Sequence, residues 1–132
     1  MRKGVILHPI INQLLTETGH TDTIVVTDAG LPIPIGLPHR IDLALKEGFP
    51  RFLDVLDTVS ADLIVEKIIL AEEVKAVSSA MHDEIIRRFP DTLVEYVPHA
   101  QFKEQTKNAR GAIRSGEFTP YANVILVAGV AY

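Results

Sequence analysis

Five polar side chains stand at points in the sequence where a binding or catalytic site could form: His20, Asp28, His99, Tyr121 and Asn123. An imidazole gives and takes a proton near neutral pH, so the histidines suit acid–base catalysis. A carboxylate orients a hydroxyl or an imidazole, and a phenol near an amide offers donors and acceptors that fit sugar hydroxyls. These residue types therefore favour proton transfer to, or binding of, a hydroxylated ligand.

His20 and Asp28 flank a short apolar segment, 23–27, that is predicted to be a buried strand. Asp28 follows the carboxyl end of this strand, at the edge where ligands bind in open α/β sheets. His20 follows the glycine that ends a helical stretch. Each residue also has a structural interpretation, because a histidine cation stabilises a helix C-terminus and an aspartate often turns the chain before a glycine. Both interpretations of each residue stay open.

The other three residues lie beside two further predicted strands. His99 follows a Val-Pro pair at the end of one strand, although the first residue of a helix could simply be solvated. Tyr121 and Asn123 belong to a polar turn directly before the apolar segment 124–130. A buried strand would hold such a turn still, as a binding site requires. The alternative is a tyrosine anchored by its hydroxyl and an asparagine that closes the turn.

The remaining titratable side chains receive no catalytic assignment. His8 is expected to help set the N-terminus of the first helix, and His82 to lie on the surface of an amphipathic helix. His39 is given no role. A charged cluster at the end of another strand is interpreted as a solvated edge or a subunit contact. It comprises Glu72, Glu73 and Lys75.

Several classes of enzyme are excluded because their sequence motifs are absent. The sequence has no phosphate loop, GxGxxG, GxSxG elbow or HExxH. It has no cysteine, which excludes disulfides and thiol chemistry and favours a reducing compartment. A metal site built from His20, Asp28 and His99 stays open, although no pair of these ligands has the i, i+4 spacing of a helical site.

Composition narrows the class of protein. The chain has 132 residues, 47% of them apolar and 23% charged, which is typical of one globular domain. A net charge of -4 without a basic cluster, and 6% aromatic residues, argue against nucleic acid. No apolar run approaches the roughly 20 residues that span a bilayer. The basic and apolar start is interrupted by polar residues and lacks a cleavage site, so we expect a cytoplasmic protein and no membrane association.

Strands and helices alternate along the chain. Strands are expected at 23–27, 40–45, 64–71, 93–97, 109–113 and 124–130. Helices are expected to begin at Pro9, at Pro50, at Ser78 or Ser79 as the N-cap, and at His99. Most of the strands are apolar throughout, which is typical of a sheet covered on both faces. The pattern predicts an α/β fold, namely one three-layer α/β/α domain over residues 1–132 with a mostly parallel, buried sheet.

Five segments taken together resemble the sugar-mutarotase family, which includes ribose and fucose mutarotases. They are 19–22 (GHTD), 28–34 (DAGLPIP), 40–45 (RIDLAL), 71–75 (AEEVK) and 113–123 (IRSGEFTPYAN). The DAGLP and GEFTPYAN forms are similar to the ribose branch.

The resemblance implies that the chain interconverts the β-pyranose and β-furanose forms of D-ribose. It implies that His20 is the acid/base, and that Asp28, His99, Tyr121 and Asn123 bind the sugar. Opening and reclosing a hemiacetal moves protons but no electrons, so no cofactor and no metal is expected. The family also implies a ring-shaped homo-oligomer, a pentamer or a homodecamer of two pentamers, with sites at the subunit interfaces.

Two other functions stay open. One is a non-catalytic module that binds or senses ribose with the same aspartate, tyrosine and asparagine. The other is a metal-dependent hydrolase that uses His20, Asp28 and His99.

Overall fold

The computed structural model describes residues 1–132 and contains six strands and five helices. The strands are β1 (Thr23–Thr27), β2 (His39–Asp42), β3 (Val65–Ala71), β4 (Leu93–Val97), β5 (Gly111–Arg114) and β6 (Val124–Ala128). The helices are α1 (Pro9–Glu17), α2 (Phe52–Ser60), α3 (Val74–Val77), α4 (Ser79–Arg88) and α5 (His99–Thr106). None of the helices combines the length and the apolar character that a membrane span requires.

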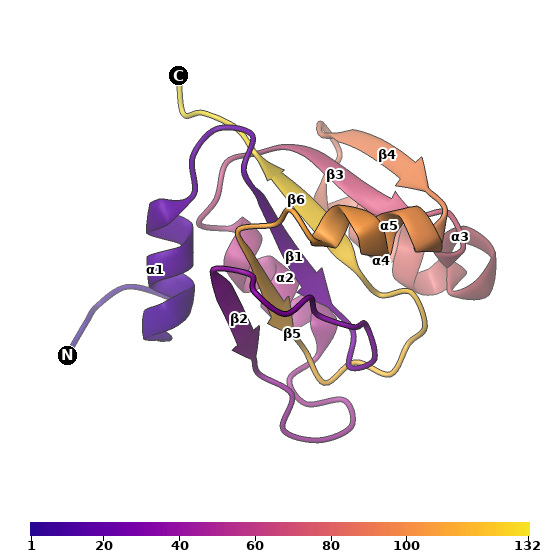
Figure 1. Ribbon diagram of the computed structural model, residues 1–132, viewed down its shortest axis with the longest axis horizontal. Coiled ribbons are helices and arrows are strands. Elements are labelled where there is room, and N and C mark those ends of the chain that lie inside the picture. Colours follow the sequence, from indigo (N-terminus) through magenta and orange to yellow (C-terminus); the bar gives the residue numbers. More distant parts are fainter.

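The six strands form one sheet in the order β2-β5-β1-β6-β3-β4. The pairs β1–β5, β2–β5 and β3–β4 are parallel, whereas β6 is antiparallel to both of its neighbours, β1 and β3. Five strands therefore point one way and β6 points the other way, which Figure 1 shows at the centre of the sheet. The predicted mostly parallel α/β sheet is confirmed.

Two apolar cores lie on opposite faces of the sheet, because alternate residues of a strand point to opposite sides. On one face, strand residues such as Ile24 and Leu126 pack against α1, α2 and α4. On the other face, Val25 and Ile125 pack against Phe102 of α5 and against the loop that follows β1. Figure 1 looks onto the face that carries α5, with α2 and α4 fainter behind the sheet.

Some predicted boundaries are wrong for local reasons. The strand expected at 40–45 ends at Asp42, whose carboxylate accepts a hydrogen bond from the Ala44 amide and turns the chain. Helix α3 has only four residues, too few for a periodic pattern to reveal it. Ser78 is the N-cap residue of α4, as expected, but its side chain makes no capping hydrogen bond; its hydroxyl donates to the Pro120 carbonyl at 2.7 Å.

Three histidines outside the predicted site have structural contacts. Nδ1 of His8 accepts hydrogen bonds from two amides in the first turn of α1, which confirms the expected cap. Nε2 of His39 lies 2.7 Å from the Glu17 carboxylate and ties β2 to α1. His82 is not a surface residue as expected. Its side chain is 19% exposed, and its Nε2 lies 2.6 Å from the Tyr96 hydroxyl.

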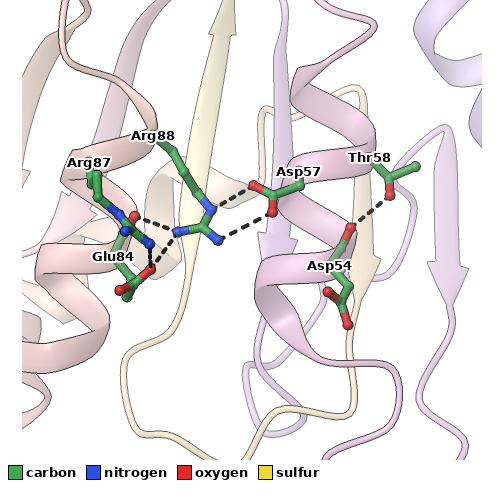
Figure 2. A network of polar contacts seen from close by, with 6 residues as sticks. All are labelled: Asp54, Asp57, Thr58, Glu84, Arg87 and Arg88. Carbon is green, nitrogen blue, oxygen red and sulfur yellow. Dashed lines mark hydrogen bonds and ion pairs between the residues drawn. The ribbon is translucent and has the colours of Figure 1, made fainter.

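A guanidinium network joins α2 to α4 on one face of the sheet (Figure 2). Nε of Arg88 lies 2.6 Å from one oxygen of Asp57, and Nη2 lies 3.2 Å from the other, while Nη1 donates to the Glu84 carboxylate at 2.8 Å. These carboxylates raise the pKa of Arg88, with Asp57 as the larger cause. Arg88 in turn holds the pKa of Glu84 below its usual value.

We expect Arg88→Leu to lower the free energy of unfolding at pH 7 by about 1 kcal/mol, the upper range for a partly exposed pair. Glu84 has a lower pKa in the folded state than in the unfolded state, so its stabilising contribution is present at neutral pH and is lost as pH falls. The difference between wild type and variant should therefore shrink below pH 4. Urea unfolding at several pH values measures it. Lys107→Leu is the control, because Lys107 is 59% exposed and pairs with Glu104 outside this network.

Candidate active site

A cavity of about 490 Å³ opens where the loops after β1 and β4 meet the loop before β6. Figure 1 shows these three loops at one end of the sheet. The polar side chains that line the cavity come from the loop after β1, from the loop before β6 and from the first two turns of α5. They are Asp28, His99, Lys103, Glu117 and Tyr121. The carboxyl ends of parallel strands are where α/β sheets bind ligands, so this is the candidate site.

Asp28 organises one wall of the cavity. Its Oδ1 accepts hydrogen bonds from the amides of Gly30 at 3.0 Å and Leu31 at 2.8 Å. Its Oδ2 accepts one from Asn123 at 3.1 Å. The expectation that Asp28 turns the chain before Gly30 is therefore confirmed. A carboxylate has about four acceptor positions, so these three bonds leave one for a ligand hydroxyl.

Asn123 lies behind this wall and does not line the cavity. Its side chain is buried, with 1% of the residue exposed. Its Oδ1 accepts from the Asp28 amide at 2.8 Å, and its Nδ2 donates to the Asp28 carboxylate. Within one chain, then, Asn123 fixes Asp28 from both sides.

His99 is the first residue of α5 and is held through its main chain. Both oxygens of Glu73 accept from the His99 amide at 3.1 Å. The imidazole packs edge-on against Tyr121, with ring centres 5.0 Å apart, and stacks on Phe102. Nδ1 of His99 is buried and has no hydrogen-bond partner in the chain. A buried acceptor without a partner costs less free energy than a buried donor without one. Nδ1 is therefore expected to be the acceptor, and the ring proton lies on Nε2.

Tyr121 adopts a left-handed backbone conformation with φ of 62°. Such a conformation is uncommon for an aromatic residue and costs about 1–3 kcal/mol, so it persists only where the surroundings impose it. Here, Pro120 is tied to Ser78, and the buried strand β6 begins three residues after Tyr121. The predicted role of a buried strand in fixing this turn is consistent with these contacts.

Two lining residues were not singled out from the sequence. Lys103 lies four residues after His99 in α5, and this i, i+4 spacing places both side chains on one helix face. Glu117 accepts from the Phe52 amide at the start of α2 and from the Thr119 hydroxyl. Lys103 could have been found from its spacing, whereas the contact between Glu117 and α2 joins segments 65 residues apart.

His20 does not lie in this cavity. It precedes β1 and Asp28 follows β1, so the two residues lie at opposite edges of the sheet. A strand of five residues spans about 17 Å, a length that no pair of side chains bridges with one proton transfer. One chain therefore brings Asp28, His99 and Tyr121 together with Asn123 behind them, but it does not bring His20 to them.

The turn that carries His20 is tightly held. The Thr21 amide donates to the Ala128 carbonyl at the end of β6, and Thr21 has a φ of 68°, an outlier for a β-branched residue. The Asp22 carboxylate accepts from the Gly19 amide at 2.8 Å and from Arg110 at 2.9 Å. The Gly19 amide is the larger cause that lowers the pKa of Asp22, and Arg110 adds to it. The His20 main chain is thus fixed at this edge.

The metal-site alternative requires His20, Asp28 and His99 to converge. No group of three or more histidine, aspartate or glutamate side chains in the chain is placed to hold a metal ion. The separation of His20 from the other two ligands is the physical reason.

The chain is similar to known proteins over its full length. The D-ribose pyranase of Geobacillus thermodenitrificans is 52% identical over 132 residues, which are 100% of this chain and 99% of the relative. The D-ribose pyranase of Bacillus cereus strain ATCC 10987 is also 52% identical, with both chains fully covered.

Two solved structures have the same fold as this chain. Bacillus subtilis RbsD complexed with D-ribose has a TM-score of 0.96 and 45% identity, with both chains fully covered. The fucose mutarotase of Streptococcus pneumoniae, in complex with L-fucose, has a TM-score of 0.77 over 96% of this chain and 95% of that one. At 23% identity, the second shares the fold. The model of the RbsD / FucU transport protein family matches residues 1–131, and the chain belongs to this family.

Proposed function

We propose that this protein is a D-ribose pyranase, an isomerase that interconverts β-D-ribopyranose and β-D-ribofuranose. The observation that carries the proposal is the polar cavity at the carboxyl edge of the sheet, in a chain that superimposes over its full length on a protein complexed with D-ribose. A carboxylate, an imidazole and a phenol on a rigid support are suited to holding several sugar hydroxyls at once.

The protein has only to transfer protons, because the C–O bond that breaks and the one that forms both belong to the sugar. One proton leaves the anomeric hydroxyl as another reaches the ring oxygen, and the C1–O bond to the ring breaks to give the open aldehyde. A different hydroxyl then attacks the aldehyde, and the two protons return. In this proposal His20 carries the proton, Asp28 accepts from a sugar hydroxyl, and His99 and Tyr121 orient the sugar. Asn123 acts on the sugar through Asp28.

The opposite positions of His20 and the cavity support a site shared between subunits. In this proposal, His20 of one subunit meets the cavity of a neighbour in a ring-shaped homo-oligomer, a pentamer or a homodecamer of two pentamers. Exposed apolar side chains support association, because they leave water when subunits join. They include Ile35, Phe49, Leu93 and Phe118. The absence of cysteine supports a cytoplasmic location.

Exchange NMR on equilibrated D-ribose tests the function. A catalyst leaves the populations unchanged, so we expect faster exchange between the pyranose and furanose anomeric protons in the presence of the protein. The oligomeric state is checked in the same sample by sedimentation. If exchange is unaccelerated but ribose still binds an intact oligomer, the protein is a ribose-binding module and the isomerase proposal is wrong.

A further inference from the structure

The His20 imidazole has one side-chain partner in the chain. Its Nε2 lies 3.0 Å from Oε2 of Glu66, a residue 46 positions further along the sequence. Glu66 is the second residue of β3, at the same edge of the sheet as the turn before β1. This contact therefore joins two segments that only the folded sheet brings together.

Stability does not account for the pair. The two side chains are 51% and 43% exposed, and exposed ion pairs contribute about 0–1 kcal/mol. A histidine held by a carboxylate at a solvent-facing edge instead matches the arrangement in which a third group orients an acid/base.

The end of β6 leaves space for the Glu66 side chain beside the His20 turn. The Gly129 amide donates to the Ile64 carbonyl at 2.8 Å and so ties the end of β6 to the start of β3. A Cβ on Gly129 would lie 3.2 Å from Cβ of Glu66 and 3.5 Å from its Oε2. The absence of a side chain at Gly129 therefore leaves the Glu66 carboxylate room beside the His20 turn.

We infer that Glu66 is the positioning residue for His20, an inference that rests on the proposed function. The carboxylate accepts a hydrogen bond from Nε2–H of the neutral ring and so fixes the tautomer. Nδ1, on the other side of the ring, then carries the lone pair that takes the proton from the anomeric hydroxyl. When Nδ1 is protonated, Glu66 stabilises the imidazolium until the proton passes to a sugar oxygen.

The test compares three variants in the assembled protein. In Glu66→Gln, the amide that replaces the carboxylate carries no charge and no longer selects one tautomer. We expect its kcat for ribose exchange to fall about tenfold, which is a part of the 10²–10⁴-fold that a positioned acid/base supplies, while KM changes little. Glu66→Asp should recover part of the loss. Glu95→Gln is the matched control, because Glu95 is a similarly exposed strand carboxylate paired with Lys67.

A second measurement is independent of activity. In the wild type, the ¹⁵N chemical shifts of His20 should report one dominant tautomer with the proton on Nε2, and Glu66→Gln should shift the ring to a mixture. Wild-type kcat in Glu66→Gln with unchanged His20 shifts would overturn the inference. If the proposed function itself is wrong, the wild-type protein will not accelerate ribose exchange. That outcome differs from a failure of the Glu66 inference, in which the wild type is active.

Discussion

Replacing His20 with alanine is expected to lower kcat for pyranose–furanose exchange by about 10²–10⁴-fold, the usual contribution of a positioned acid/base. The free energy of unfolding should change by no more than about 0.5 kcal/mol, because the side chain is 51% exposed and its one partner is a surface carboxylate. Exchange NMR at saturating ribose and urea unfolding measure the two quantities. Full activity in His20→Ala would move proton transfer to another residue, first to His99.

Mixed oligomers test where the His20 of each site comes from. His20→Ala retains an intact cavity, and Asp28→Asn retains an intact His20, so each variant alone should be nearly inactive. If sites are shared between subunits, random co-assembly in equal amounts should restore about a quarter of the sites, since one combination in four pairs the two intact parts. Mixed oligomers without activity would place the complete site within one chain.

The isosteric change Asn123→Asp should have the largest effect on stability. It replaces an amide that donates to Asp28 Oδ2 at 3.1 Å with a second carboxylate, at a position where 1% of the residue is exposed. Leaving a buried charge without a partner costs about 3–5 kcal/mol. We expect the free energy of unfolding at pH 7 to fall by about 3 kcal/mol, the lower end of this range, because Asp28 is only half-buried. We also expect a large loss of ribose affinity.

The pH dependence identifies the cause of that loss. Two adjacent carboxyls bind one proton more readily in the folded variant than in the unfolded chain, so lowering the pH should favour the folded state. Urea unfolding should therefore show a smaller deficit at pH 5 than at pH 7. Asn108→Asp, at an exposed position after α5, is the matched control and should cost little at either pH. An equal deficit at both pH values for Asn123→Asp would contradict repulsion between the carboxyls.

The sequence predicts the strands of this sheet better than it predicts their directions. The segment 23–27 matches β1 because a continuous apolar run bounded by polar residues defines a buried strand. The segment 93–97 matches β4 although Glu95 interrupts it, because its alternation of apolar and polar residues suits a partly exposed strand at the sheet edge. The antiparallel direction of β6 could not be read from its apolar residues, since an apolar run is the same in either direction. It follows from the loop after β5, which reverses at the cavity edge and returns directly into β6.

The candidate site was predicted as a list of residues but not as a geometry. That His20 and Asp28 lie at opposite edges was accessible in principle, because one straight strand separates them. The contact of Asn123 with Asp28 was not accessible, because it joins residues 95 positions apart through the pairing of β1 with β6. Glu66 was missed for the same reason, since only the order of strands brings it beside His20.

The placement of His20 and the cavity at opposite edges has a consequence for assembly. A site divided between neighbours joins unlike surfaces head to tail, and such contacts give either a closed ring or an open filament. An open chain of subunits always leaves one unused His20 at one end and one unused cavity at the other. A closed ring leaves neither, so each added contact completes a site and the number of working sites equals the number of subunits. For a divided site, closure of the ring is itself a gain in activity.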